Sequence, residues 1–296
     1  MKTKMTGFIL MSLLIATTTA ASAQVTLTGT SYTETFDSLG SGLPRGWTVR
    51  TNSCATNLGA PASFNATNTS WGTQTGQFAN YASTTGNGGT NFLGGESTTV
   101  QGNCTNRCLG MRQTTSFGDP GAAFVLQLQN TLGFANFQLS LDCNLLYEQT
   151  NRSTVWTIDY GVGATPGSFS VLGTYTDPGA FGKTSKTFSF GNRLDQLDQN
   201  VWIRVAALDP SSGSNRCDTV GIDNFKLSYN ASGMLEPIPL NIQLLGGSAV
   251  LTWSNAAFAL QSAPSAAGTY SNVPGATSPY TNPAAGPQQY FRLKAN

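Results

Sequence analysis

The chain has 296 residues, of which only 10% are charged, and its 15 basic and 14 acidic residues nearly cancel. A sparsely charged, near-neutral surface does not suit nucleic acid or an anionic membrane as partner, because both attract a basic patch. Histidine is absent, which excludes Ser-His-Asp and Cys-His catalysis and His-ligated zinc. Oxygen ligands remain for any bound ion, and these favour calcium.

The first 23 residues have the pattern of a secretory signal peptide. Lys2 and Lys4 precede the apolar run 8–16, and small residues then lead up to Ala23. The run is too short to span a bilayer as a helix, and no later segment is apolar enough to do so. We therefore expect cleavage after Ala23 and a secreted protein, extracellular or at the cell surface, with no membrane span.

Residues 24–230 are predicted to form one all-β domain, an antiparallel two-sheet jelly-roll sandwich. Apolar and polar residues alternate with period two in several segments, and Gly-, Asn- and Pro-rich turns connect them. Hardly any stretch has helical periodicity. The clearest strand patterns lie at 137–143, 155–160, 186–190 and 201–207. The segments 32–37 and 221–229 are expected to be the first and last strands and to lie side by side.

The stretch Thr51–Gly110 is a long polar insertion with scattered aromatic residues. Such a region is either a packed surface loop or a ligand-contact surface. We predict that Trp71, Tyr81 and Phe92 are exposed and bind ligand, because exposed aromatic rings stack on sugar rings.

Five cysteines, at positions 54, 104, 108, 143 and 217, are expected to oxidise in an exported chain where the geometry allows. Cys104 and Cys108 are close enough in sequence to close a small loop. The odd number leaves at least one free thiol. Cys143 is the best candidate, because the strand alternation places it toward the core.

The carboxylates of the first and last strands are the candidate metal ligands. By strand alternation Glu34 shares a face with Phe36, and Asp223 shares a face with Phe225, so both carboxylates are predicted to point inward. A buried carboxylate needs a hydrogen-bond partner, an ion pair or a metal. The sharper hypothesis is a structural calcium held by Glu34, Asp37 and Asp223; the simpler one is capping of backbone N–H groups or pairing with an arginine.

These segments resemble a known architecture. Phe36-Asp37, Leu43-Pro44-Arg45-Gly46-Trp47 and the closing Gly221-Ile-Asp-Asn-Phe-Lys-Leu227 are similar to the edge strands of secreted bacterial jelly-roll domains. These include the concanavalin A-like and carbohydrate-binding-module sandwiches. The resemblance covers roughly Ser31–Asn230 and implies a structural calcium at Glu34 or Asp37 and at Asp223. It also extends to a family of exported domains with no assigned activity.

A break at residues 231–239, rich in Pro and Gly, is interpreted as a linker. Residues 240–296 then contain four strand-like segments and resemble a small C-terminal β module of exported bacterial proteins. A module of this size is marginal alone and is expected to pack on the first domain or on a partner.

Three functions are compatible with these patterns. The leading hypothesis is a non-catalytic module that binds glycan (a polysaccharide) or a cell-surface or matrix partner. The second is a structural or adhesive surface protein whose C-terminal module serves attachment. The third is a carbohydrate-active enzyme that uses carboxylates, with Glu148 as the best isolated candidate, although a structural role paired with the nearby Arg152 is favoured for Glu148 over a catalytic one. No catalytic residue is assigned.

Overall fold

The structure is a computed structural model, and it describes residues 24–84, 94–149, 152–177, 180–213, 217–232, 238–256 and 258–295. The predicted signal peptide and the predicted contact residue Phe92 lie outside the described residues. The chain forms two compact units, which divide between Ala231 and Ser232. Within the described residues, no helix is both long and apolar enough to cross a membrane.

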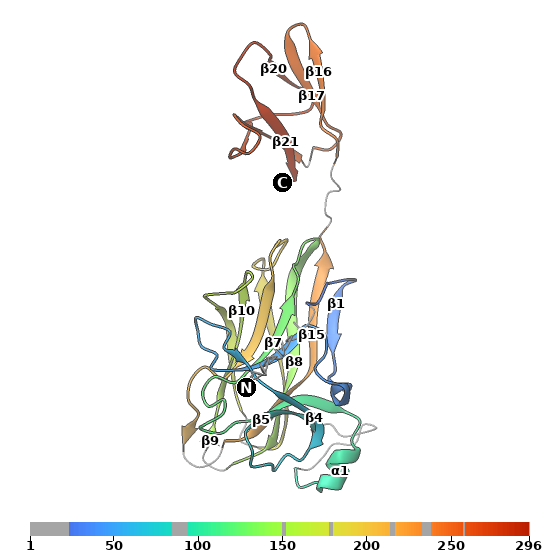
Figure 1. Ribbon diagram of the computed structural model, residues 1–296. Helices are drawn as coiled ribbons and strands as arrows, with labels where there is room; N and C mark the ends of the chain where they lie inside the picture. Colours follow the sequence, from blue (N-terminus) through green and yellow to red (C-terminus); the bar gives the residue numbers. More distant parts are fainter. Residues whose placement is uncertain are drawn as a thin grey trace, which may run out of the picture. The chain divides into compact units, whose positions relative to one another are not determined.

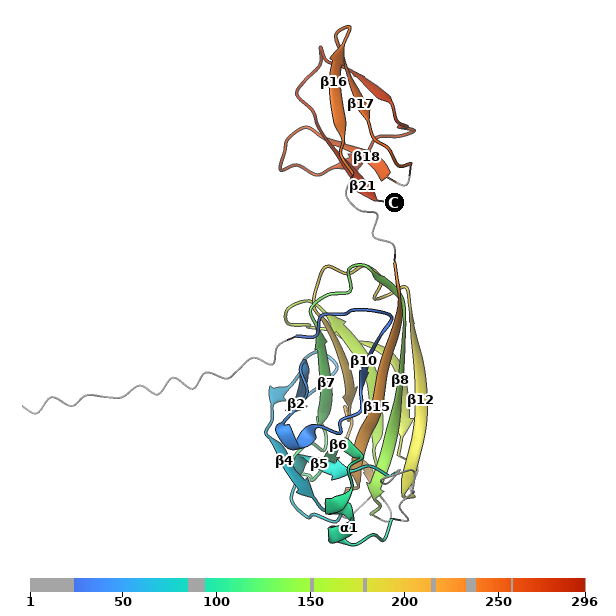
Figure 2. The same cartoon turned by 90° about the vertical axis from the view of Figure 1, so that its right-hand side faces the viewer.

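The first unit is a sandwich of two β-sheets, as predicted (Figures 1 and 2). One sheet has the order β12-β8-β15-β6-β5-β4, with β1 added to β15. Its strands are β1 (Ser31–Glu34), β4 (Phe64–Thr69), β5 (Gln77–Ala82), β6 (Arg107–Arg112), β8 (Phe134–Tyr147), β12 (Gly182–Gly191) and β15 (Thr219–Ala231). We call it the seven-stranded sheet.

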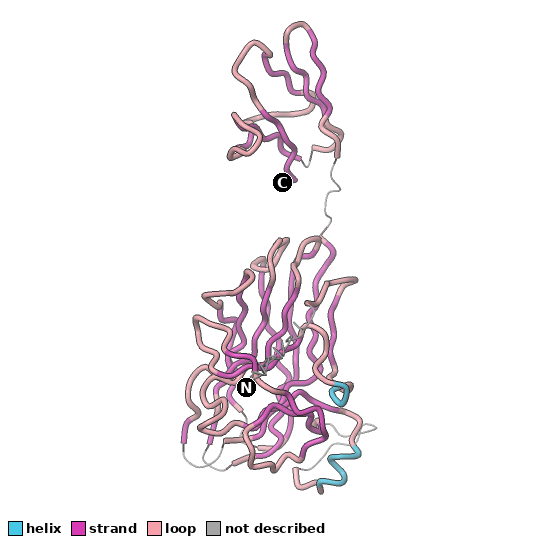
Figure 3. The backbone as a smooth tube through the Cα atoms, in the orientation of Figure 1, coloured by secondary structure: helices cyan, strands magenta, loops and turns pink. Residues whose placement is uncertain are grey.

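The other sheet has six strands, in the order β11-β10-β13-β7-β2-β3. Its strands are β2 (Trp47–Thr51), β3 (Ala60–Pro61), β7 (Ala123–Leu128), β10 (Val155–Val162), β11 (Ser170–Thr176) and β13 (Val201–Ala206). Among the pairings in both sheets, only that of β4 with β5 is parallel. Loops and two short helical segments, Leu39–Ser41 and α1 (Thr98–Asn103), connect these strands (Figure 3). β9 (Arg152–Ser153) and β14 (Ser212–Gly213), which are far apart in sequence, form a separate two-stranded antiparallel sheet.

The core lies between the two sheets. It contains every second residue of the long strands, for example Leu139, Leu141, Cys143 and Leu145 of β8, all nearly inaccessible to solvent. This is the period of two that the sequence predicts. As expected, the first and last strands of the sandwich are neighbours, with Glu34 opposite Phe225.

A β-bulge in β15 reverses this alternation. Between the pairs Asp223↔Asp142 and Lys226↔Ser140, β15 advances by three residues while β8 advances by two. Asn224 absorbs the extra residue with a φ of 48°, in the left-handed region that Asn tolerates. Core-facing positions therefore change from the even-numbered Ile222 to the odd-numbered Phe225.

Asp223 consequently faces outward from the sandwich core, opposite to Phe225. The prediction that the two share a face is wrong, because simple alternation does not include the bulge.

The outer face of the seven-stranded sheet is covered over one part of its area. The segment that contains Trp71, together with α1, packs on β5 and β6 and encloses a second apolar cluster that includes Tyr81 and Cys108. Gly110 of β6 leaves room for the Tyr81 ring of the neighbouring strand β5, since a Cβ built at Gly110 would lie 2.1 Å from that ring.

The second unit has two three-stranded sheets, β16-β17-β20 and β19-β18-β21. Its strands are β16 (Asn241–Leu245), β17 (Ser248–Thr252), β18 (Phe258–Ala263), β19 (Ser271–Asn272), β20 (Tyr280–Pro283) and β21 (Tyr290–Ala295). Leu251, Trp253, Phe258 and Leu260 form its own core. This agrees with a small β module.

Candidate functional site

A polar trough crosses the uncovered part of the seven-stranded sheet. It has a volume of about 520 Å³ and runs over four strands, β1, β15, β8 and β12. Most of its lining residues are polar, among them Ser31, Gln138, Ser189, Lys226 and Ser228, and the aromatic residues Phe137 and Tyr229 also line it. No aspartate or glutamate lines it.

The trough exists because outward positions of these strands carry polar residues. Ser31 lies opposite Ser228, and Ser228 lies opposite Gln138, so the three side chains stand in a row on one face. None of the three makes a side-chain hydrogen bond within the described residues. Their donors and acceptors are therefore available to solvent or ligand.

A second groove lies on the outer face of the six-stranded sheet, with a volume of about 550 Å³. Trp202 of β13 and Arg50 of β2 form its floor, and the Arg50 guanidinium carbon lies 5.6 Å from the centre of the Trp202 ring. The loop that includes Asn57 and the loop that includes Pro166 line its sides. No carboxylate lines this groove either.

A buried ion pair supports the wall of this groove. Arg204 donates two hydrogen bonds to Asp159, at 2.7 and 2.6 Å, and the side chains of both residues are at most 1% exposed. The second Nη of Arg204 donates to the carbonyl oxygens of Cys54 and Asn57 at 3.1 and 2.7 Å. The guanidinium also lies 3.3 Å from the centre of the Phe169 ring. The pair thereby fixes the loop at Cys54–Asn57 to β13.

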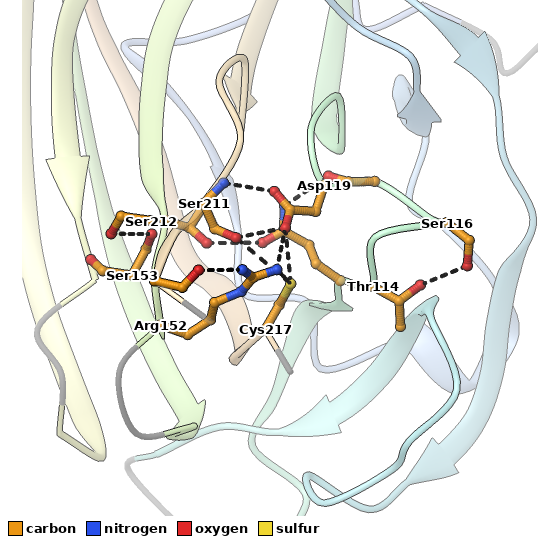
Figure 4. Close-up of polar contacts among 12 residues, drawn as sticks. Thr114, Ser116, Asp119, Arg152, Ser153, Ser211, Ser212 and Cys217 are labelled. Carbon is orange, nitrogen blue, oxygen red and sulfur yellow. Dashed lines mark hydrogen bonds and ion pairs between the residues drawn. The ribbon is translucent and has the colours of Figure 1, made fainter. Parts of the chain in front are cut away.

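A third polar cluster ties the loops at β9 and β14 together (Figure 4). Asp119 accepts hydrogen bonds from the backbone N–H and the hydroxyl of Ser211, at 2.8 and 2.6 Å, and forms an ion pair with Arg152 at 3.0 Å. The Cys217 thiol donates to the same carboxylate at 3.1 Å. Burial raises the pKa of Asp119, but the hydrogen bonds from Ser211 and Cys217 outweigh it and lower the pKa overall.

This cluster has the features of a structural network. Its carboxylate is fully paired and ionised. Burial raises the pKa of the Cys217 thiol, which disfavours the reactive thiolate. Arg152 pairs with Asp119 here, so the predicted pairing of Arg152 with Glu148 is wrong.

Next to this cluster, Asp177 and Asp218 form a buried acid pair. Asp177 accepts hydrogen bonds from Ser153 and from the backbone N–H of Thr154, and Asp218 accepts one from the N–H of Gln149. The two carboxyl groups interact electrostatically, and the Oδ2 atom of Asp218 has no hydrogen-bond partner within the described residues. Burial raises both pKa values, and for Asp218 the adjacent Asp177 raises the pKa further.

The predicted calcium ligands do not form one group. Glu34 accepts a hydrogen bond from the N–H of Phe36 at 2.8 Å, and Asp37 accepts one from the N–H of Arg107 at 2.8 Å. Asp223 accepts from the Ser83 hydroxyl at 2.6 Å and from the N–H of Asn224 at 2.7 Å. In the described ranges, no three Cys, Asp or Glu residues form a metal-binding group.

These contacts agree with the simpler of the two hypotheses, in which the carboxylates cap backbone N–H groups. Both oxygens of Asp223 face donors, and a donor hydrogen occupies the position where a cation would bind. The residues present therefore do not fit a calcium site. Asp223 is nevertheless 1% exposed, because it is buried on the outer face of the sheet beneath the covering segment and not in the sandwich core.

Asp223 has an unusual titration. Burial raises its pKa to about 7, against the hydrogen bonds from Ser83 and Asn224, and the charges of Asp37 and Asp142 add to the rise. Asp142 itself has a pKa below its usual value: burial raises it, but hydrogen bonds from Ser185, Lys183 and Asn224 outweigh this effect.

The predicted ligand contacts Trp71 and Tyr81 are not exposed. Trp71 is 1% and Tyr81 0% exposed. The Trp71 indole N–H donates to the carbonyl of Ala82 at 2.9 Å, and its ring lies 5.0 Å from that of Phe181. Trp71 belongs to the segment that covers the sheet, and Tyr81 belongs to strand β5 beneath it, so neither ring can stack on a sugar. The prediction of their exposure is wrong.

The sequence analysis did not identify Trp202 as a groove residue, because the pattern at 201–207 indicates only a strand. The sequence pattern also gives no reason to place Arg50, which lies in another strand, next to Trp202.

The five cysteines form no disulfide. The Cys104 thiol donates to the carbonyl of Asn106, and the Cys108 thiol to that of Ala82, so the predicted small loop is not closed.

No family model and no curated protein matches the chain. Several solved structures are similar. A cleaved adhesin domain of Lys-gingipain from Porphyromonas gingivalis has a TM-score of 0.38 at 14% identity over 69% of this chain and all of that one. A CBM22-1 xylan-binding domain from Paenibacillus barcinonensis has a TM-score of 0.36 at 11% identity over 72% of this chain and all of that one.

A third similar structure holds CBM22-1 and GH10 modules of a xylanase from Clostridium thermocellum, in complex with xylohexaose. Its TM-score is 0.36 at 8% identity, over 68% of this chain and 29% of that one. The chain thus spans less than a third of that structure and the full length of the other two. The three TM-scores are all below 0.5, and the identities are at most 14%.

Proposed function

We propose that this chain is an exported, non-catalytic module that binds a glycan in the polar trough of the seven-stranded sheet. The trough carries the proposal: it has about 520 Å³ of open space on one sheet face, and the side chains of Ser31, Gln138 and Ser228 in its lining make no side-chain hydrogen bond within the described residues. Sugar hydroxyls both donate and accept hydrogen bonds, and Ser, Gln and Asn side chains match them in both roles.

The same lining favours binding over hydrolysis. A glycosidase needs two carboxyl groups across a cleft, about 5–10 Å apart. Neither the trough nor the Arg50–Trp202 groove has an acidic residue in its lining. Glu148, the candidate catalytic residue, is exposed and lines neither of them. A reducing-sugar assay on the polysaccharides that the protein retains is expected to stay blank.

The direct test is affinity electrophoresis against a panel of neutral polysaccharides, followed by calorimetry with an oligosaccharide of the one retained. Xylan belongs in the panel, since similar solved modules are described as binding it. The double variant Gln138→Ala/Ser228→Ala is expected to bind about 10-fold more weakly or worse, because each lost hydrogen bond contributes roughly 1 kcal/mol.

Gln243→Ala is the matched control. Gln243 is an exposed strand residue of the second unit, so the same chemical change there leaves the trough intact. Equal affinity of the double variant and the control, or no retention of any glycan by the native protein, contradicts the proposal.

A further inference from the structure

Arg50 is a partly buried cation without a carboxylate partner. The described residues contain three ion pairs, Arg152–Asp119, Lys183–Asp142 and Arg204–Asp159, and Arg50 belongs to none. Its side chain donates to neutral acceptors, the hydroxyl of Thr48 at 3.4 Å and the carbonyl of Gly59 at 3.0 Å. Burial lowers the pKa of Arg50, since partial desolvation disfavours a charge that nothing nearby neutralises.

Arg50 keeps free donors toward the groove. A guanidinium has five N–H groups in a planar fork, and the two hydrogen bonds of Arg50 use Nε and Nη1. Nη2 makes none within the described part of the chain. A planar fork with a free edge is the geometry that binds a carboxylate.

The surroundings of Arg50 select the size and charge of a ligand. Arg50 is the one charged residue among those that line the groove, and its neighbours there include two amides, Asn52 and Asn57. A single cation suits a monoanion better than a doubly charged phosphate. The volume of about 550 Å³ is also much larger than a carboxylate, so the ligand must bring additional polar and apolar surface.

The floor of the groove is rigid. The Trp202 indole N–H donates to the carbonyl of Gly163 at 2.9 Å, which fixes the orientation of the ring. On the opposite wall, the Arg204–Asp159 pair fixes the backbone at Asn57. Gly59 closes this loop at a φ of 79°, where a Cβ would lie 2.3 Å from the carbonyl oxygen of Thr51. A groove held on both sides binds ligand without the cost of ordering its walls.

We infer that the Arg50–Trp202 groove is a second binding site, for the carboxylate of an acidic sugar, a uronic acid within a polysaccharide. The Arg50 fork holds the carboxylate, the Trp202 edge contacts the ring, and the Asn52 and Asn57 side of the groove faces the sugar hydroxyls. The site is on the sheet opposite to the trough. Ligand binding in this groove can therefore be tested independently of glycan binding in the trough.

The test is calorimetry on the native chain with a galacturonic acid trimer and with its methyl ester, at low salt. Esterification removes the charge and keeps the rings. The acid is expected to bind at least 10-fold more tightly than the ester, because a charge-assisted hydrogen bond is roughly twice as strong as a neutral one. Equal binding of the two, or binding of neither, overturns the inference.

Substitutions locate the site. Arg50→Ala is expected to remove the preference for the acid, and Arg50→Lys to keep part of it, because lysine preserves the charge and loses the fork. Arg193→Ala, which removes an exposed arginine outside both grooves, is expected to bind like the native chain. Unfolding temperatures of Arg50→Lys and the native chain are compared to verify folding. Preference for the acid that survives Arg50→Ala, or that Arg193→Ala also removes, contradicts the assignment.

Carboxylates without a sugar ring provide a further comparison in the calorimetry. Acetate and a short peptide with a free C-terminus carry the same charged group without a sugar ring. They are expected to bind at least 10-fold more weakly than the uronate trimer. A peptide that binds as tightly as the trimer refutes the sugar assignment and indicates a peptide carboxylate in its place.

Discussion

Asp223 shows how the surroundings of one residue set its chemistry. It lies under the covering segment at 1% exposure, and its pKa is raised to about 7. In the unfolded chain an aspartate titrates near pH 3.9. A folded state that holds its proton more tightly than the unfolded state is stabilised at low pH and loses that contribution as pH rises through the folded pKa.

We therefore predict that the free energy of unfolding falls as pH rises from about 4, near the unfolded pKa, to about 7, the folded pKa of Asp223. The raised pKa of the Asp177–Asp218 pair acts in the same direction. Asp119 and Asp142 have lowered pKa values. Their contribution to the free energy of unfolding is present at higher pH and is lost only as pH falls below about 4.

Asp223→Asn isolates the contribution of this residue. The amide keeps an acceptor for the Asn224 N–H and offers a donor to the Ser83 hydroxyl. Between pH 5.5 and pH 8.5 the free energy of unfolding of the variant is expected to fall by on the order of 2 kcal/mol less than that of the native chain, because about 1.5 units of the shift lie in this interval. Urea denaturation at pH 5.5 and pH 8.5 measures this. An identical fall for both proteins shows that Asp223 ionises normally in the fold.

The calcium hypothesis makes a different residue-level prediction. An ion bound only by the native state raises the unfolding temperature, so its removal by EDTA lowers it. Because both oxygens of Asp223 already accept hydrogen bonds, we expect EDTA to leave the unfolding temperature unchanged. A fall that added calcium reverses, and that Asp223→Asn abolishes, establishes the site that the resemblance implies.

At the scale of elements, the Arg204–Asp159 pair joins neighbouring strands β13 and β10 and holds the groove loop. Asp159→Asn leaves a fully buried guanidinium without its counter-charge and is expected to cost about 3–5 kcal/mol. Lys183→Ala is the comparison, since the Lys183 side chain is 42% exposed and an exposed pair contributes less than about 1 kcal/mol. Chemical denaturation of both variants measures the difference. Similar losses contradict this account of the buried pair.

The elements themselves were largely predictable, because their alternation has a short period. The predicted strands at 137–143, 155–160 and 186–190 lie within β8, β10 and β12, and the one at 201–207 matches β13 except for its last residue. The β15 bulge was not predictable in this way. One additional residue at Asn224 moves every later side chain to the other face, and no residue in the sequence Ile-Asp-Asn-Phe specifies the register that requires it.

The candidate site was less predictable than the strands. Trp71 and Tyr81 lie in a polar insertion, and composition alone favours exposure. Their burial depends on contacts with the distant strand β6, where Gly110 admits the Tyr81 ring. The grooves likewise combine residues far apart in sequence, such as Arg50 with Trp202. Only the folded sheet brings these residues together.

At the scale of the whole molecule, each unit has its own apolar core. The core of the sandwich contains residues between Val25 and Tyr229, and the core of the second unit contains Leu251, Trp253, Phe258 and Leu260. A chain that ends at Ala231 is therefore expected to fold and to keep both grooves. Its glycan affinities should equal those of the native chain, and its unfolding temperature should lie within a few degrees of the sandwich transition. Loss of cooperative unfolding in this truncated chain contradicts the independence of the sandwich.

The same truncation separates glycan binding from attachment. Edge strand β16 of the second unit exposes Ile242, Leu244 and Leu245 at 56%, 77% and 73%, which is unusual for an uncharged strand at the edge of a sheet. If the C-terminal module serves attachment, removal of residues 240–296 lowers retention at the cell surface while calorimetric affinity stays constant. The double variant Leu244→Lys/Leu245→Lys should reproduce the loss without unfolding the module, because exposed positions tolerate lysine. Unchanged retention in both proteins refutes the attachment role and leaves glycan binding as the function of the sandwich alone.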